Sequence, residues 1–503
     1  MKRRLSILLA GAMLLTGCAS NGAAESASVS DTAPENIGSA ADKTATAERK
    51  EDIVLTMACF TEPEETMQEL IDSFNAEDNG VKIEVKSFAS NKEPDGMPHG
   101  FTDEELTKLD FDVTQELINK DTIDLVGTFS FGNGAKFEIF KRKGGFVDLN
   151  KFMENDPEIN SDTLNSHILD LCEYDGKLYS IPTHYYAMTM LSKAEYGGTT
   201  RNWTIDEFID HWNAMPEGST VNYSTVSEGI YYDVLRENTP AFIDYKNCEV
   251  HFDAPDFRKM LEFCHSFDSN MGRKSDDYIN TSHPMLVENC PLTGYQNSIR
   301  ADIDYANNTI TYSRLRDGKY TLVGYPTSDR NGAFLCGINE CAIRSNISEE
   351  KQQAAWKFLR EFYMEDYQTE HYAMRDEITT PEGTVVQFGF IDGFPINNAA
   401  RKRIAQNVIN GEYLSSYEKE GTIRINGDEP ATLINSCQPD QADIDYIDDY
   451  MNSIERWEFP YADRELFWIV EEEVLTYLQG EQDIDKTIDL IQNRASIWIS
   501  EQA

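Results

Sequence analysis

The spacing of apolar residues changes twice between residues 53 and 85. Residues 53–60 form a short apolar run without helical spacing, and residues 81–85 alternate apolar and polar side chains, so both predict strands. Between them, apolar residues recur every three or four positions and predict one buried helix face: Met67, Leu70, Ile71 and Phe74. A strand, a helix and a strand in this order are typical of a parallel βαβ unit, which predicts an α/β fold.

The same pattern then follows once more. Residues 111–118 predict a helix, and residues 122–126 predict a strand that ends before Gly127-Thr-Phe-Ser-Phe131. In open α/β sheets, ligands bind beyond the carboxyl ends of the strands. Three aromatic residues fall at such ends and are candidate ligand contacts: Phe60, Phe129 and Phe131. Packing in the core at a strand end is an equally good explanation for each of them.

The N-terminus has the pattern of a secretory signal peptide over residues 1–17. Three basic residues, 2–4, precede an apolar run over residues 5–15, which is shorter than the roughly 20 residues of a permanent membrane span. Leu15-Thr-Gly-Cys18 resembles a bacterial lipobox, which implies that Cys18 carries a lipid anchor at the extracytoplasmic face of the cell membrane. The alternative is a chance Gly-Cys pair at the end of an ordinary leader.

Residues 18–50 differ in composition from the rest of the chain. They contain no aromatic residue and almost no large aliphatic one. Such a segment buries too little apolar surface to offset its ordering entropy. We expect a flexible tether between the lipid anchor and the folded body, and no later stretch is apolar enough to suggest a membrane span.

Charge narrows the range of partners. The chain carries 88 Asp and Glu residues against 44 Lys and Arg residues, a formal net charge of −44 at pH 7. This balance repels nucleic-acid phosphates, so we expect no nucleic acid among the partners. The negative charge is compatible with neutral or cationic ligands, and it does not indicate which ligand binds.

Eight cysteines remain besides Cys18. None of them falls in the close CxxC spacing of metal and redox motifs. We expect most of them to be small core residues, and their spacing leaves open whether any pair forms a disulfide.

Motifs of common enzyme chemistry are missing from the sequence. The histidines form no HExxH pair, no GxSxG occurs and no GxxxxGK[ST] loop exists, so we expect no metal, no cofactor and no catalytic residue. Residues 443–449 predict an exposed acidic helix entry rather than a calcium loop, because the glycine and the terminal glutamate of an EF-hand are missing. A secreted glycoside-cleaving enzyme, which needs two carboxylates facing each other across a cleft, stays open as an alternative.

Several short segments occur in the order of a known family. They are residues 122–126, 145–149 (Gly-Phe-Val-Asp-Leu), 174–182 (Tyr-Asp-Gly-Lys-Leu-Tyr-Ser-Ile-Pro), 202–208, 325–327, 337–338, 354–359 and 393–396. In this order they resemble the extracellular solute-binding proteins of ATP-driven sugar importers, the family that includes maltose-binding protein. The resemblance extends over nearly all of residues 53–500.

The resemblance implies an α/β, two-lobed, periplasmic-binding-protein-like fold with hinge strands and a ligand cleft between the lobes. Lobe 1 would hold residues 51–187 and 326–394, and lobe 2 residues 188–325 and 395–503. The implied function is that of a monomer that captures a small solute, a carbohydrate or oligosaccharide, and delivers it to the permease subunits of an ABC importer. A sensor or an adhesin with the same body stays open as well.

The resemblance also indicates ligand contacts. They are Tyr185 and Tyr186 at the entry to the hinge, Tyr295 in a loop that commonly supplies a stacking aromatic, and Phe467 on the closing helix. Aromatic rings suit a ligand that is apolar on its faces and polar at its edges. If residues 182–188 are extended, strand alternation turns one of the two hinge tyrosines inward. On the closing helix we expect Trp468 in the core and Glu471 at the surface.

The sequence departs from the maltose-binding relatives in ways that leave the cargo open. Phe129, Ser130 and Phe131 stand where those relatives place acidic residues, so the polar groups for a maltodextrin are not reproduced. Additional residues at 90–110 and 376–388 are placed to reshape the rim of the cleft. Peptides, polyamines and metal chelates therefore stay open beside sugars.

Overall fold

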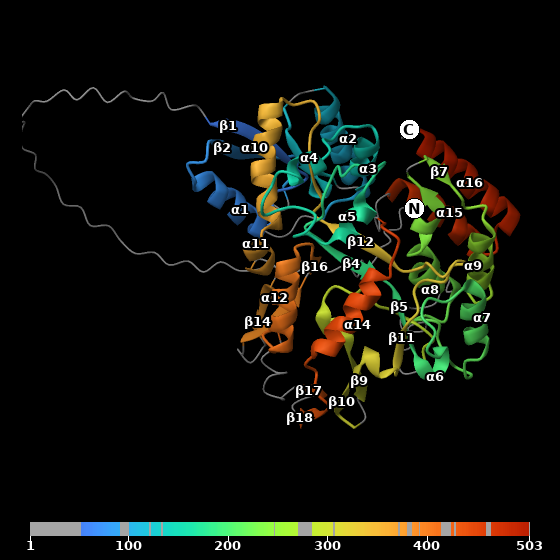
Figure 1. The fold of residues 1–503 in the computed structure, drawn as a ribbon. Coiled ribbons are helices and arrows are strands. Elements are labelled where there is room, and N and C mark those ends of the chain that lie inside the picture. Colours follow the sequence, from blue (N-terminus) through green and yellow to red (C-terminus); the bar gives the residue numbers. More distant parts are fainter. Residues whose placement is uncertain are drawn as a thin grey trace, which may run out of the picture.

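The computed structural model describes two α/β bodies with strands passing between them (Figure 1). The described residues are 52–90, 100–119, 122–131, 134–245, 247–269, 284–304, 307–370, 373–379, 385–391, 393–413, 424–426, 429–458 and 464–501. Cys18 and the predicted signal peptide and tether lie outside these ranges, so these predictions stay untested.

A four-stranded sheet organises the first body, in the order β13-β3-β1-β2. Its strands are β1 (Ile53–Cys59), β2 (Val81–Ser87), β3 (Leu125–Gly127) and β13 (Cys341–Ile343). β1 pairs in parallel with β2 and β3, whereas β13 runs antiparallel to β3. Helix α1 (Glu65–Ala76) joins β1 to β2 and buries Met67, Ile71 and Phe74. The predicted βαβ unit is confirmed.

Helices cover both faces of this sheet. Because side chains alternate along a strand, Met57 of β1 packs on the core beneath α1 and α10 (Glu349–Leu359). Its neighbour Ala58 packs on the opposite core with Val113 of α2 (Asp103–Asn119) and Phe137 of α3 (Gly134–Arg142). The first body also contains α4 (Asn150–Met153) and α5 (Ser166–Cys172). Thus α2 and α3 lie together on one face of the sheet.

The second body is mainly helical. Its helices are α6 (Ala194–Gly197), α7 (Ile205–Asn213), α8 (Ser227–Ile230), the π-helical turn η2 (Tyr231–Arg236), α9 (Pro255–His265), α15 (Arg464–Leu478) and α16 (Ile484–Glu501). It also contains the sheet β11-β5-β8 and a hairpin of β6 (Ile243–Asp244) and β7 (Glu249–Val250). The sheet strands are β5 (Met190–Lys193), β8 (Glu288–Asn289) and β11 (Tyr320–Leu322). A separate core joins these helices, with Phe208 of α7, Phe257 of α9 and Val470 of α15 fully buried in it.

Further helices and strands pack below the first body (Figure 1). They are α11 (Glu365–Glu370), α12 (Asn398–Ile409), α14 (Gln441–Asn452), β9 (Ile299–Asp304), β10 (Thr309–Arg314), β14 (Ala373–Thr379), β15 (Val385–Ile391), β17 (Arg424–Asn426), β18 (Glu429–Pro430) and β19 (Thr432–Ile434). The prediction of an exposed helix entry at residues 443–449 is wrong for Asp443. This side chain is 0% exposed and pairs with Arg314 and Arg316, because β10 and the turn after it pack against the start of α14.

Three antiparallel strands connect the bodies: β4 (His184–Met188), β12 (Phe334–Ile338) and β16 (Phe394–Pro395), in the order β12-β4-β16. Their side chains alternate between the two cores. Tyr185 of β4 and Leu335 of β12 belong to the core of the first body, whereas Tyr186 and Cys336 face the core of the second. The predicted alternation of the two hinge tyrosines is confirmed. The lobe boundaries predicted from the sequence stay a prediction.

The eight cysteines that the structure describes are free thiols. Six are buried, and Cys248 and Cys437 are half-buried. The expectation that most cysteines are core residues is confirmed.

A partly buried ionic network packs against the crossing strand β4. Arg401 of α12 donates from Nε to the Tyr295 hydroxyl over 2.9 Å and pairs through Nη2 with Asp448 of α14. The Tyr295 hydroxyl donates to the same carboxylate over 2.9 Å. The guanidinium also stands 5.9 Å from the ring centre of Tyr185 in β4, whose hydroxyl accepts a hydrogen bond from Asn165. The network therefore fixes β4 to α12 and α14.

We predict that Arg401→Met lowers the free energy of unfolding by about 2–3 kcal/mol, because it removes the cation that pairs with Asp448 and Tyr295. Urea unfolding measures the effect. Arg403→Met is the matched control on the same helix, since Arg403 pairs with Asp366 at the surface, and it should cost less than about 1 kcal/mol. Equal losses in both variants would contradict a bracing role for Arg401.

Candidate functional site

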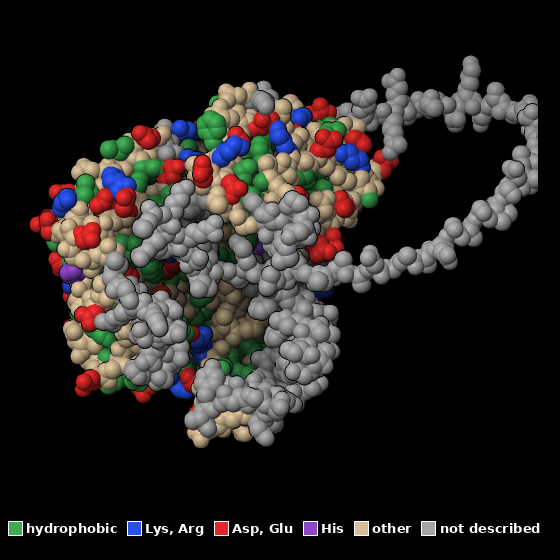
Figure 2. All heavy atoms as spheres, turned by 180° about the vertical axis from the view of Figure 1, so that it is seen from behind, with side chains coloured by type: hydrophobic (Ala, Val, Ile, Leu, Met, Phe, Trp, Pro, Cys, Tyr) green, Lys and Arg blue, Asp and Glu red, His purple; other side chains and the backbone are tan. Residues whose placement is uncertain are grey.

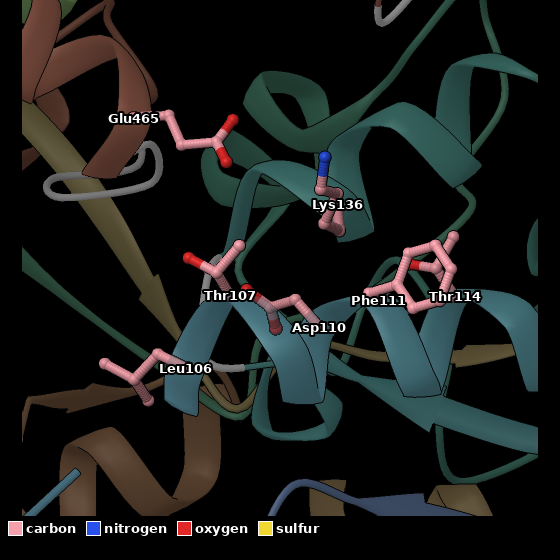
Figure 3. A pocket seen from close by; sticks show the side chains of 7 residues that line it. All are labelled: Leu106, Thr107, Asp110, Phe111, Thr114, Lys136 and Glu465. Carbon is pink, nitrogen blue, oxygen red and sulfur yellow. The ribbon is translucent and has the colours of Figure 1, made fainter. Parts of the chain in front are cut away.

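A pocket lies where the first body meets the second. It has a volume of about 190 Å³ and is lined by Leu106, Thr107, Asp110, Phe111 and Thr114 of α2, Lys136 of α3 and Glu465 of α15. Figure 3 shows Lys136 and Glu465 approaching the space above α2 from different helices. α2 and α3 belong to the first body and α15 to the second, so both bodies contribute side chains to one pocket.

The hydrophobic pattern of α2 explains why Phe111 reaches the pocket. The buried stripe of this helix follows helical spacing through Leu106, Asp110, Val113 and Leu117. Phe111 falls beside this stripe and is 60% exposed. A large ring left open at a pocket offers an apolar face to a ligand.

Three charged side chains line the pocket together with that ring: Asp110, Lys136 and Glu465. Asp110 is buried, and Glu465 accepts a hydrogen bond from Trp498 Nε1 over 2.8 Å, which fixes its carboxylate at the start of α15. Lys136 adds a cation from α3. Elsewhere, acidic side chains are spread over the outer surface, which is hollowed between its upper and lower parts in the view from behind (Figure 2). The pocket thus combines hydrogen-bonding groups of both charges with one apolar face, an arrangement suited to reversible binding of a small polar molecule.

Phe60 and Phe129 meet at the carboxyl ends of the strands in the first body. The backbone N–H of Phe60 donates to the carbonyl oxygen of Phe129 over 3.0 Å, and both side chains are half-buried. The Phe60 ring lies 5.3 Å from that of Phe101, edge to face, two residues before α2 begins. Phe131 instead turns into the core and packs against Phe140 of α3, 6.2 Å between ring centres.

The other predicted contacts lie at the crossing strands and on α15. Tyr185 and Tyr295 are each 1% exposed within the network around Arg401. Tyr186 is half-buried on the opposite face of β4, and Phe467 is buried on α15. As ligand contacts, all seven aromatic residues predicted from the sequence stay predictions.

The expected orientation of α15 is wrong at two positions. Trp468, expected in the core, is 42% exposed, whereas Glu471, expected at the surface, accepts a hydrogen bond from the Tyr232 hydroxyl over 2.9 Å. The helix turns Phe467 and Val470 inward, and this rotation carries Glu471 toward the turn η2 and Trp468 away from it.

The sequence analysis missed four side chains of the pocket: Phe111, Thr114, Lys136 and Glu465. Phe111 carries a signal in the sequence, since it is an aromatic residue outside the regular stripe of its helix. Lys136 and Glu465 have no such signal in the sequence, because each is an ordinary charged residue on its own helix. They line the same pocket only because α3 and α15 come together in the fold. The prediction that residues 90–110 shape the rim of the cleft stays a prediction.

A metal centre and a membrane-spanning helix are both absent from the described part of the chain. No group of three or more His, Cys, Asp or Glu side chains in the residues described is arranged to hold a metal ion. None of the described helices combines the length and apolar character that crossing a bilayer requires.

One carboxyl group near the core of the second body has an unusual pKa. Burial, with a smaller contribution from the neighbouring Glu237 carboxylate, raises the pKa of Asp233 to about 7. Asp233 lies in η2, and its carbonyl oxygen accepts a hydrogen bond from Asn289 of β8. Between about pH 4 and pH 7 the folded chain therefore holds a proton that the unfolded chain has released, so this group's contribution to stability is lost as the pH rises through that window.

We predict that Asp233→Asn raises the free energy of unfolding at pH 8 by roughly 1–3 kcal/mol and changes it little at pH 4. Urea unfolding at both pH values measures this difference. Asp253→Asn, at an exposed position of the same body, is the control and should change stability little at either pH. An equal effect of Asp233→Asn at the two pH values would contradict the raised pKa.

Comparisons with known proteins concern the fold. No family model and no curated protein matches this sequence. Among solved structures, the sugar-binding protein MalE from Xanthomonas citri matches with a TM-score of 0.50 and 11% identity, covering 89% of this chain and 98% of its own. A de novo designed cysteine esterase matches with a TM-score of 0.52 and 13% identity, covering 90% and 98%.

An ABC substrate-binding protein from Listeria monocytogenes in complex with cycloalternan also matches, with a TM-score of 0.48, 13% identity and coverage of 90% of this chain and 100% of its own. At these identities the similarity concerns the fold alone. The match to MalE spans 89% of this chain, so it is not confined to one body. The chain therefore has the two-lobed α/β fold of the solute-binding proteins represented by MalE, as the sequence predicts.

Proposed function

We propose that the chain is the substrate-binding lipoprotein of an ABC importer and captures a carbohydrate by closing its two bodies over it. One observation carries this proposal: α2 and α3 of the first body and α15 of the second line the same pocket. A solute held there contacts both bodies, so its binding free energy favours the closed arrangement over an open one.

The chemistry of the pocket favours a carbohydrate. The exposed ring of Phe111 suits the C–H face of a sugar, while Asp110 and Lys136 offer an acceptor and a donor to hydroxyl groups at its edge. MalE, whose fold this chain shares, is a sugar-binding protein. The net charge of −44 is compatible with an uncharged ligand.

The predicted aromatic contacts extend this proposal along the cleft. Phe60, Phe129 and Tyr186 are half-buried and keep part of their rings open to a ligand. The remaining four are buried and would touch a ligand only in an arrangement that exposes them: Phe131, Tyr185, Tyr295 and Phe467.

The proposed cellular setting follows from the N-terminus. A leader over residues 1–17 directs export, and Cys18 carries the lipid anchor at the extracytoplasmic face of the membrane. The tether over residues 18–50 then lets a monomeric receptor reach the permease subunits. The proposal includes no catalytic step, so purified chain should release no reducing ends from glycans. The similarity to a designed esterase concerns the fold alone.

The first test is a thermal-shift screen of the purified chain against monosaccharides, oligosaccharides, amino acids, peptides and polyamines. A ligand that binds only the folded state stabilises it by RT ln(1 + L/Kd), where L is the free ligand concentration, so the melting temperature rises with ligand concentration. We expect a concentration-dependent shift with one class of sugar. A shift with another class and none with sugars would contradict the carbohydrate assignment.

For the sugar with the largest shift, we predict that Phe111→Ala weakens binding by about 1–3 kcal/mol, because the variant loses the ring that stacks on the ligand. Isothermal titration calorimetry measures the change. Ile118→Ala is the matched control, since Ile118 is 63% exposed on the same helix and does not line the pocket. Unchanged affinity in Phe111→Ala, or equal losses in both variants, would reject this pocket as the site.

A further inference from the structure

Helix α3 makes a second contact with the second body. Lys136 lines the pocket near the start of this helix, and Arg142 is its last residue. At 1.5 Å per residue, the two positions are about 9 Å apart along the helix axis. The same rigid element therefore carries one residue of the pocket and, at its other end, Arg142.

Arg142 reaches the turn that joins β6 (Ile243–Asp244) to β7 (Glu249–Val250). Its Nη1 group donates hydrogen bonds to the carbonyl oxygen of Tyr245 and to Cys248 Sγ, the latter over 2.8 Å. The guanidinium also stands 6.0 Å from the centre of the Tyr245 ring, at cation–π range. Tyr245 and Cys248 pack against the core of the second body, whereas α3 packs through Phe137 into the first. The contact thus joins the two bodies.

A buried cluster of charged side chains lies next to Arg142 on α3. Glu138, one turn before Arg142, forms an ion pair of 2.6 Å with Lys141, which lies 3.5 Å from Glu340. Two carboxylates thus meet one ammonium group in a buried cluster, and Arg142 supplies the second positive charge. Burial raises the pKa of Glu138, and the positive charge of Arg142 is among those that oppose this rise.

The hydrogen bonds of Arg142 to the second body use one of its three guanidinium nitrogen atoms, Nη1. The Nε and Nη2 atoms of Arg142 are buried and form no hydrogen bond with any residue that the structure describes. The hydrogen bonds of Arg142 to the turn therefore come from Nη1, beside the cation–π contact with the Tyr245 ring. A contact of this kind is strong enough to bias a two-state equilibrium and is broken without unfolding either body.

We propose that Arg142 is a clasp that favours the closed arrangement of the two bodies before any ligand binds. It lies outside the pocket, so it is a positioning residue that sets ligand affinity through the fraction of chains that are closed. This effect on affinity rests on the proposed function. The clasp itself does not, and it is testable without a ligand.

The test compares Arg142→Met with the unaltered chain, both free of ligand. Methionine keeps an unbranched apolar side chain and removes every N–H donor. We expect a larger radius of gyration by small-angle X-ray scattering. We also expect alkylation of Cys248 by N-ethylmaleimide, followed by peptide mass spectrometry, to become about tenfold faster, which corresponds to ~1.4 kcal/mol in the opening equilibrium.

Two further variants control the experiment. Lys143→Met removes a positive charge from the next residue, which is exposed, and should leave both readouts unchanged. Tyr245→Ala removes the ring on the other side of the contact and should shift both readouts in the same direction as Arg142→Met, by a smaller amount. Melting temperatures show whether each variant is folded. If Arg142→Met does not fold, the two readouts of Tyr245→Ala decide the test.

Two outcomes would overturn the clasp. One is an unchanged radius of gyration together with an unchanged alkylation rate. The other is faster alkylation at an unchanged radius, which would show that Arg142 only shields Cys248 locally. Because no sugar is present, neither outcome bears on the carbohydrate proposal, and a failed sugar screen leaves the clasp standing.

Discussion

The strands β4 and β12 each contribute side chains to both hydrophobic cores. The position of one body relative to the other depends on how these strands pair. Successive side chains of a strand point to opposite faces, so Tyr185 packs into the first core while Tyr186, its neighbour, faces the second. A slip of one residue in the pairing of these strands would exchange the two sets of side chains. Arg401 fixes the register further, because its guanidinium stands over the Tyr185 ring while pairing with Asp448.

The position of the pocket follows from this arrangement. The crossing strands hold the two bodies so that α2 and α3 face α15, and the pocket forms from residues that no single body provides. α3 adds Arg142 at its far end, against the turn of the second body. The proposed binding site and the proposed clasp thereby share one helix, so movement of α3 away from the second body would open the pocket and release the clasp together.

The sequence predicts what depends on local pattern. The βαβ unit, the buried face of α1 and the alternation at Tyr185 follow from hydrophobic period and are confirmed. Positions that depend on a distant partner were not predictable in the same way. Glu471 is held by Tyr232, and Asp443 by arginines from another element, so both are more buried than their charge suggests. Glu465 joins the pocket only because α15 faces α2 in the folded chain.

The central claim is that one ligand is held by both bodies at once. Hydrogen–deuterium exchange of the purified chain, with and without the sugar that stabilises it, tests this claim most directly. Capture between the bodies predicts slower exchange in peptides from α2 and α3 and, at the same ligand concentrations, in peptides from the start of α15 and the β6–β7 turn. Slower exchange confined to one body, with the other unchanged at saturation, would contradict it.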